Sequence, residues 1–287
     1  GVRTTAAPTT PMTAPAASAE PAGARLASVD IVRRAIMVLM ALDHVRDFVT
    51  ELRFTPENLA QGSAALFAAR WFTHFCAPGF FLLSGIGIGI AMHRRRSPAD
   101  MTTYLLTRGL WLLVLELIVT PVGWRFSFDL IPAFALVLWA LGWSMILMAL
   151  LVHLPRAVVA GIGLILLAGH HLLDGLQPAG FGSLGWLWNV LHVQGFVITG
   201  KLLIAYPLIP WVGVMALGYV LASCYQWSAD RRRRFFLMAG LIAVALFIAL
   251  RFANGYGNPE PWTSQRTPAL TVASFLNVRK YPPSLHF

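Results

Sequence analysis

The stretch APGFFLLSGIGIGIAMHRRR at residues 77–96 shows the pattern that decides the fold, because a long apolar run ends there in a cluster of positive charge. A helix needs about 20 apolar residues to cross the roughly 30 Å of hydrocarbon in a bilayer. Comparable runs recur along most of the chain, and we place membrane spans at residues 31–50, 65–92, 104–121, 130–152, 157–173, 203–225 and 235–253. The sequence therefore predicts an all-α, polytopic membrane helical bundle of about seven transmembrane helices.

The composition agrees with a membrane protein. Of the 287 residues, 57% are hydrophobic and 12% are charged, whereas an ordinary soluble domain carries about 25% charged residues. The net charge of +10 could suggest nucleic-acid binding, but the positive residues cluster in short loops between apolar runs, which is typical of a topology signal. Cys76 and Cys224 lie within apolar segments, so we expect buried thiols and no disulfide.

Basic residues mark one side of the predicted bundle. Arg33 and Arg34 stand at the entrance of the first span, and residues 93–96, Arg156 and residues 231–234 fall on the same side. The positive-inside rule assigns that side, and the N-terminus, to the cytoplasm. Residues 1–25 are rich in Thr, Ala and Pro, so we expect a disordered tail before a membrane domain over residues 26–287.

Four ionisable residues lie close together in the outer half of the first span: Asp43, His44, Arg46 and Asp47. Charge at membrane depth costs several kcal/mol unless the groups pair or meet water. On a helix Asp43, Arg46 and Asp47 share one face, so they can pair with one another. A carboxylate that orients His44 would let this histidine act as a general base. The alternative is a cluster that only caps the span at the interface.

The second span carries polar residues at a similar depth, including His74. Pro78 and Gly79 follow, and they free backbone groups in the way that is common where helices line a cavity. The glycines at 85, 87 and 89 favour close helix packing over a phosphate loop, because no strand precedes them and no Lys-Ser/Thr follows.

Further polar residues lie at or near the later spans. Glu116 is placed in the middle of the third span and needs a partner, for which Arg108 or a polar group on another helix is a candidate. A second group resembles metal ligands, yet its spacing matches no zinc motif, so we expect an interfacial or substrate-facing role and no metal. This group comprises His170, His171, Asp174, His192 and Gln194. Trp186, Trp188, Trp211 and Trp262 could sit at the headgroup level.

Several motifs resemble one family. They are SVDIVR at 28–33, LMALDHVRDF at 39–48, THFCAP at 73–78 with FLLSG at 81–85, PWVGVM at 210–215, SFLNV at 274–278 and KYPPS at 280–284. Together they resemble the bacterial membrane proteins grouped with the catalytic domain of heparan-α-glucosaminide N-acetyltransferase, within the transmembrane acyltransferases. The chain departs from the pattern at Arg34, where the family has glycine, and it stops where the family continues into further spans, so we expect a C-terminally truncated domain.

The resemblance implies transfer of an acyl group, most simply acetyl, from cytoplasmic acyl-CoA to an outer-face acceptor such as an amino sugar or glycan. It places His44 at the reactive centre as general base or acyl carrier, with Asp43 or Asp47 orienting it and His74 sharing the proton transfer. It suggests a substrate-binding set of Arg46, Trp211, Asn277, Lys280 and Tyr281. The phosphates of coenzyme A could meet Arg94, Arg95 and Arg96, for which topology signalling is the plainer interpretation.

The same resemblance implies a multi-pass protein of the bacterial inner membrane. Its expected partners are the lipid bilayer, acyl-CoA and the outer-face acceptor, with a homo-oligomer left open and no nucleic acid. Two alternatives remain at the level of sequence: a proton-coupled transporter in which residues 43–47 form a relay, and a non-catalytic membrane scaffold.

Overall fold

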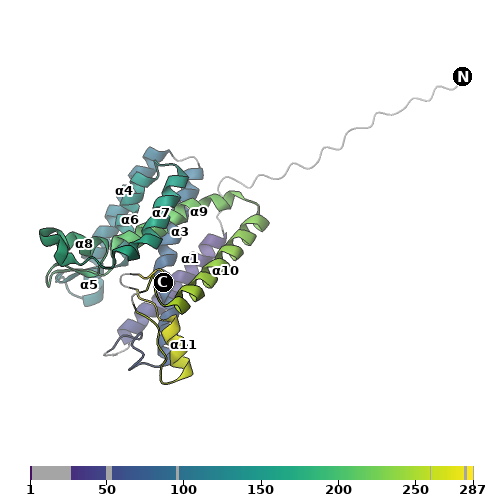
Figure 1. The fold of residues 1–287 in the computed structure, drawn as a ribbon. Coiled ribbons are helices and arrows are strands. Elements are labelled where there is room, and N and C mark those ends of the chain that lie inside the picture. Colours follow the sequence, from purple (N-terminus) through teal and green to yellow (C-terminus); the bar gives the residue numbers. More distant parts are fainter. Residues whose placement is uncertain (2–26, 50–53, 95–96, 259, 281–282, 287) are drawn as a thin grey trace.

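A computed structural model describes Gly1 and residues 27–49, 54–94, 97–258, 260–280 and 283–286. The predicted disordered tail therefore lies outside the described residues, apart from Gly1. Helices dominate the described part and pack into a bundle (Figure 1). The predicted all-α membrane fold is confirmed.

The helices follow the predicted order. The first span is α1 (Ala27–Val49), the second is α2 (Ala64–His74) with α3 (Cys76–His93), and the third is α4 (Pro98–Val114), the π-helical turn η1 (Leu115–Val119) and α5 (Thr120–Arg125). The later spans are α6 (Val137–Leu151), α7 (Arg156–Gly169) with η2 (His170–Leu173), α9 (Leu208–Leu221) with η4 (Ala222–Gln226), and α10 (Ala229–Ala253). The shorter helices are η3 (Pro178–Leu184), α8 (Gly185–Leu191) and α11 (Pro268–Leu276).

Five of the seven predicted spans are long and apolar enough to cross a bilayer: Ala64–His93, Pro98–Arg125, Arg156–Leu173, Leu208–Gln226 and Ala229–Ala253. The other two differ for separate reasons. The helix α1 has 23 residues but carries several charges, whereas α6 is apolar but has only 15 residues. The predicted span at 130–152 was too long at its start, because residues before Val137 form a strand and a turn.

Two prolines lie where the helices change direction or pitch. The second span breaks at Phe75, which places Pro78 in the first turn of α3, where a missing N–H breaks no helical hydrogen bond. The third span widens into a π-helical turn at Leu115–Val119, directly before Pro121 in α5. Such wider turns are frequent at functional sites, and this one contains Glu116.

The core of the bundle lies between α3 and α9, which pack closely. A Cβ atom on Gly85 would lie 2.0 Å from the carbonyl oxygen of Met215, and one on Gly218 would lie 2.3 Å from that of Leu82. The packing role predicted for Gly85 is therefore confirmed. Trp211 is 1% exposed and stacks on Phe81 with ring centroids 4.7 Å apart, so its predicted place at the headgroup level was wrong.

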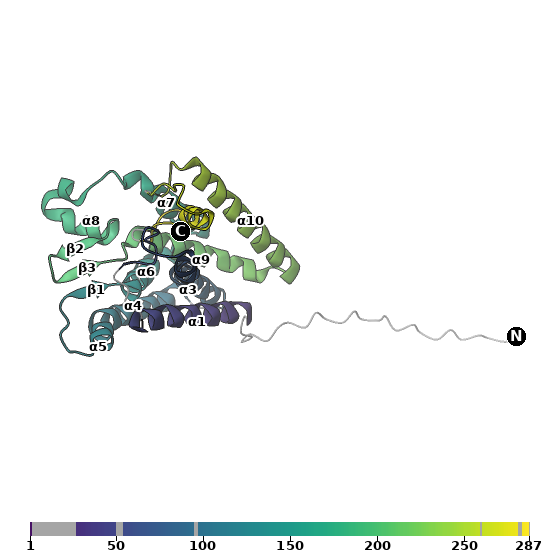
Figure 2. The same ribbon diagram turned by 90° about the horizontal axis from the view of Figure 1, so that it is seen from below.

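A small sheet covers one end of the bundle, beside α8 (Figure 2). Strand β1 (Ala133–Ala135) runs parallel to β3 (Leu202–Ile204), and β2 (Gly195–Ile198) runs antiparallel to β3. These strands were not predicted from the sequence, because each has only three or four residues inside or beside an apolar run. The sheet holds residues 133–136 directly before α6.

The opposite end of the bundle gathers the basic loops, and we call it the basic end. Arg156 lies 3.2 Å from His93 and 3.4 Å from Ser223, so the loops after α3, α6 and α9 meet there. The guanidinium of Arg231 lies 4.5 Å from the ring centroid of Trp227. The helix α10 begins at this end and runs along the outside of the bundle (Figure 1), with mostly exposed apolar side chains that would face lipid.

Candidate functional site

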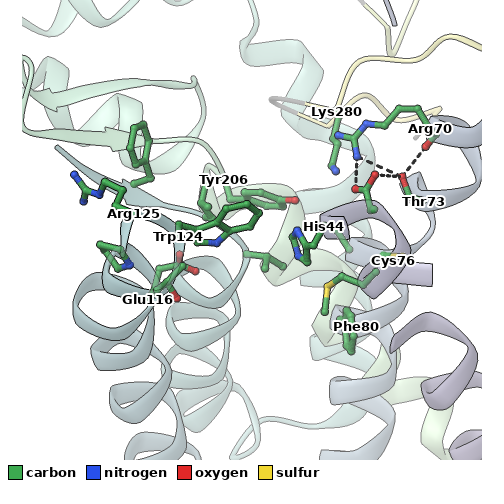
Figure 3. Close-up of a pocket in the computed structure, with 18 residues that line it drawn as sticks. His44, Arg70, Thr73, Cys76, Phe80, Glu116, Trp124, Arg125, Tyr206 and Lys280 are labelled. Atoms are coloured by element: carbon green, nitrogen blue, oxygen red, sulfur yellow. Dashed lines mark hydrogen bonds and ion pairs between the residues drawn. The ribbon is translucent and has the colours of Figure 1, made fainter. Parts of the chain in front are cut away.

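A cavity of about 400 Å³ opens at the end of the bundle opposite the basic loops (Figure 3). Its wall is formed by α1, α2, α3, the η1–α5 segment, the residues around β1, Tyr206 and Lys280. Apolar side chains such as Met40 and Phe80 line much of it. The polar residues in the wall are Asp43, His44, Arg70, Thr73, Glu116, Thr120, Arg125, Tyr206 and Lys280.

Asp43 joins α1 to α2 through buried polar contacts. Its carboxylate forms ion pairs with Arg70 and, at 2.9 Å, with Arg46, and it accepts a hydrogen bond of 3.0 Å from the Thr73 hydroxyl. Two guanidinium groups and a hydroxyl offset the cost of placing this carboxylate in a partly buried position. The pairing of Asp43 with Arg46 agrees with the predicted helical spacing.

Glu57 extends this network from the loop before α2. Its carboxylate lies 2.9 Å from Arg70 Nε and 3.4 Å from His74 Nε2, and its backbone carbonyl accepts a hydrogen bond from the Asn277 amide. Burial alone would raise the pKa of Glu57, but the hydrogen bond with His74 and the charge of Arg70 outweigh burial and lower it to about 2. The sequence did not predict a role for Glu57, because no local motif in this short loop indicates that Arg70 and His74 of the following helix are its partners.

His44 also lines the cavity (Figure 3). Its ring meets Trp124 edge-on, with centroids 5.2 Å apart, and Trp124 stacks on Phe48. Among the described residues, no hydrogen bond holds the His44 ring. The suggestion that Asp43 orients His44 is not supported, because successive helical side chains diverge by about 100° and Asp43 turns toward Arg70. The side chain of Asp47 lies outside the described residues.

Glu116 is buried on the far wall and is 1% exposed. Its Oε2 accepts hydrogen bonds from the backbone N–H groups of Leu138 at 2.8 Å and Trp139 at 3.3 Å. The carboxylate thus caps the N-terminus of α6, where the helix dipole favours negative charge. Of the two alternatives for its partner, a polar group on another helix is the one observed, whereas the guanidinium of Arg108 lies over the Tyr104 ring on an exposed face of α4.

The comparison with known families decides the identity of the chain. The family model described as heparan-alpha-glucosaminide N-acetyltransferase, catalytic, matches residues 25–252. The chain belongs to this family. No curated protein and no solved structure matches it. The matched region includes α1 to α10 and most of the cavity wall, whereas α11 and Lys280 follow it.

Membership in the N-acetyltransferase family makes acetyl-CoA the expected donor and a bilayer the surroundings of the helices. Of the residues suggested for substrate binding, only Lys280 lies in the cavity wall. Arg46 pairs with Asp43, Asn277 binds the Glu57 backbone, and Trp211 packs in the core behind Tyr206, with ring centroids 5.3 Å apart. Tyr281 lies outside the described residues.

Neither His74, which was predicted to share the proton transfer, nor Arg94, which was predicted to bind phosphate, lines the cavity. His74 is buried against Glu57 and does not line the cavity. Arg94 is exposed at the basic end, while Arg95 and Arg96 lie outside the described residues. The helix α3 (Figure 1) begins beside the cavity and ends at the basic end, so its length separates the two.

The histidines after α7 form a separate cluster. Asp174 lies 2.7 Å from His171 Nδ1 and 3.0 Å from His192 Nε2, and His170 lies 3.1 Å from the carbonyl oxygen of Pro283. Burial lowers the pKa of His192, against the opposing charge of Asp174. Within the described part of the chain, no group of three or more His, Cys, Asp or Glu side chains is placed to hold a metal ion. The cluster instead fastens residues 283–285 to the end of α7.

Proposed function

We propose that this protein is an acyltransferase of the bacterial inner membrane, which moves acetyl from cytoplasmic acetyl-CoA to an acceptor on the outer face. The observation that carries the proposal is the position of His44. It lines the cavity at the end of the bundle opposite the basic loops, beside several other polar side chains. The positive-inside rule supports a cytoplasmic basic end and an outer cavity.

His44 is the residue for proton or acyl transfer. As a general base, a ring nitrogen takes a proton from the acceptor amine or hydroxyl while that atom attacks the thioester carbonyl; the C–S bond breaks and coenzyme A leaves as its thiol after protonation of sulfur. As an acyl carrier, the ring nitrogen itself attacks the thioester carbonyl, the C–S bond breaks, and coenzyme A leaves as its thiol after protonation of sulfur. The acceptor amine or hydroxyl then attacks the acyl-imidazole, the bond between the acyl carbon and the ring nitrogen breaks, and the proton of the acceptor passes to the imidazole. Both routes need an accessible ring, and His44 is exposed to the cavity.

Cations near His44 can stabilise the negative charge that develops on the thioester carbonyl oxygen during the attack. Lys280 lies in the cavity wall, and Arg70 lies there between two carboxylates. Both Lys280 and Arg70 are candidates for stabilising an oxyanion. Asp43 positions Arg70 and Thr73 of α2 rather than His44.

A second cavity, of about 270 Å³, supports a route for the donor from the basic end. It is lined by Arg33 of α1, by Ser84, Gly87 and Ala91 of α3, and by Tyr104 of α4. Residues 76, 80, 84, 87 and 91 follow one another at helical spacing, so one face of α3 lines both cavities. The pantetheine arm of acetyl-CoA would lie along this face, with its phosphates near Arg33 and Arg94.

A sided assay tests the proposal. The protein is inserted into sealed vesicles with its basic end outward, glucosamine is trapped inside, and labelled acetyl-CoA is added outside. We expect labelled N-acetylglucosamine inside the vesicles. Label that forms only when donor and acceptor share one side would contradict transmembrane transfer. Proton flux without any acetyl transfer would favour the transporter.

A further inference from the structure

One carboxylate oxygen of Glu116 has no hydrogen-bond partner among the described residues. Oε2 caps α6, but Oε1 is buried and accepts no hydrogen bond from any described residue. An unpaired buried carboxylate oxygen is costly, and native structures rarely keep one. Since Glu116 lines the cavity, a ligand there can supply the missing donor.

The position of this oxygen is fixed. The carboxylate belongs to the π-helical turn Leu115–Val119, and two backbone N–H groups of α6 hold its other oxygen. Leu136 and Val137, at the start of α6, lie in the same wall. A rigidly held acceptor atom discriminates between ligands better than a mobile surface carboxylate does.

Arg125 supplies a complementary group on the same wall. Its Nη2 atom is buried and has no hydrogen-bond partner in the described part of the chain, and Arg125 also lines the cavity. Arg125 and Glu116 form no ion pair with each other among the described contacts, so each keeps an unused polar atom. In Figure 3, Trp124 and Tyr206 are drawn between these two residues and His44.

We propose that Glu116 and Arg125 bind the acceptor of the acetyl transfer, an inference that rests on the proposed function. Glu116 Oε1 accepts a hydrogen bond from an amine or hydroxyl of the acceptor, and Arg125 Nη2 donates one to an acceptor oxygen. The site therefore selects a small polar molecule, or the terminal unit of a larger one, that carries a donor and an oxygen together. A simple alkylamine lacks the oxygen and binds more weakly.

Glu116→Gln separates binding from capping. The amide oxygen of glutamine can still accept the N–H groups of Leu138 and Trp139, whereas its NH₂ group replaces the free oxygen with a donor. Glu260→Gln is the matched control, because Glu260 is exposed in the loop after α10. The probe is labelled glucosamine, and its binding is measured without acetyl-CoA on the full chain in nanodiscs.

We expect wild type and Glu260→Gln to bind glucosamine equally, and Glu116→Gln to bind it about tenfold to a hundredfold more weakly at an unchanged melting temperature. In the transfer assay, Glu116→Gln should raise KM for glucosamine and leave kcat nearly unchanged. Cyclohexylamine should bind wild type less well than glucosamine does.

Two results would overturn the inference: no glucosamine binding by wild type, or equal binding by wild type and Glu116→Gln. A variant that melts earlier but binds as well as wild type would show that Glu116 only caps α6. Binding that depends on Glu116 without any acetyl transfer would leave the inference standing and would overturn the proposed function instead.

Discussion

Asp43 and Asp30 lie on the same helix and both pair with arginine, but their surroundings differ. Asp30 forms an exposed pair with Arg33, whereas the Asp43 side chain is largely buried against two arginines. Removing one member of a buried pair leaves the other charge uncompensated, while exposed pairs contribute little. Asp43→Asn should lower the free energy of unfolding by about 3 kcal/mol in detergent titrations.

The control for this prediction is Asp30→Asn, which should cost at most about 1 kcal/mol. Equal losses in the two variants would show that the Asp43 network is as dispensable as a surface pair.

The ionisation of Glu57 makes the stability of the folded protein depend on pH. Its pKa in the folded protein is about 2, below the ordinary value of 4.5. A lowered carboxyl pKa stabilises the folded state above pH 4.5, and that contribution is lost as the pH falls from 4.5 toward 2. Wild type should therefore melt at a higher temperature than Glu57→Gln at pH 5, and most of this difference should be lost by pH 2.5. A difference that is constant between these pH values would contradict the assigned pairing.

At the residue scale the sequence shows which ionisable groups lie within the spans, but it does not predict their partners. The cluster at residues 43–47 is recognisable because charge is rare within apolar runs. Its main partner, Arg70, lies 27 residues away, and the backbone groups that bind Glu116 begin 22 residues away. Such partners depend on how helices pack against one another, which local spacing does not determine.

At the scale of elements, the contact between α3 and α9 depends on backbone approach at Gly85. Gly87, one half-turn away, has open space where a Cβ atom would lie. Gly85→Ala should lower the melting temperature strongly, because its methyl group would overlap the α9 backbone. Gly87→Ala should leave stability unchanged or raise it by up to about 1 kcal/mol through helix propensity. Similar destabilisation in both variants would contradict this packing.

Long apolar runs predicted the helices well, since the need to bury backbone polar groups in lipid leaves few other structures. The short strands were not predicted, because their composition resembles that of the helices beside them. The strands at residues 133–135 and 202–204 adjoin apolar helices and share their composition, so the predicted spans absorbed them. The break at Phe75 was not predicted either, and Pro78 lies three residues after it, in a first helical turn that tolerates proline.

At the scale of the whole molecule, one face of α3 lines both cavities, and in the proposed function donor binding should depend on it. Gly87→Leu places a side chain in the second cavity. We expect this variant to raise KM for acetyl-CoA about tenfold and to leave glucosamine binding unchanged. Gly161→Leu is the control, because Gly161 on α7 also has open space but lines neither cavity. Equal donor KM values in the two variants would contradict the proposed route.

The central claim is that His44 performs acetyl transfer in the outer cavity. The most direct test follows labelled acetyl from acetyl-CoA to glucosamine in wild type, His44→Ala and His153→Ala, where His153 is an exposed histidine at the basic end. We predict a loss of about a hundredfold or more in kcat for His44→Ala, with wild-type rates for His153→Ala and unchanged melting temperatures in both. Transfer at the wild-type rate by His44→Ala would contradict the claim.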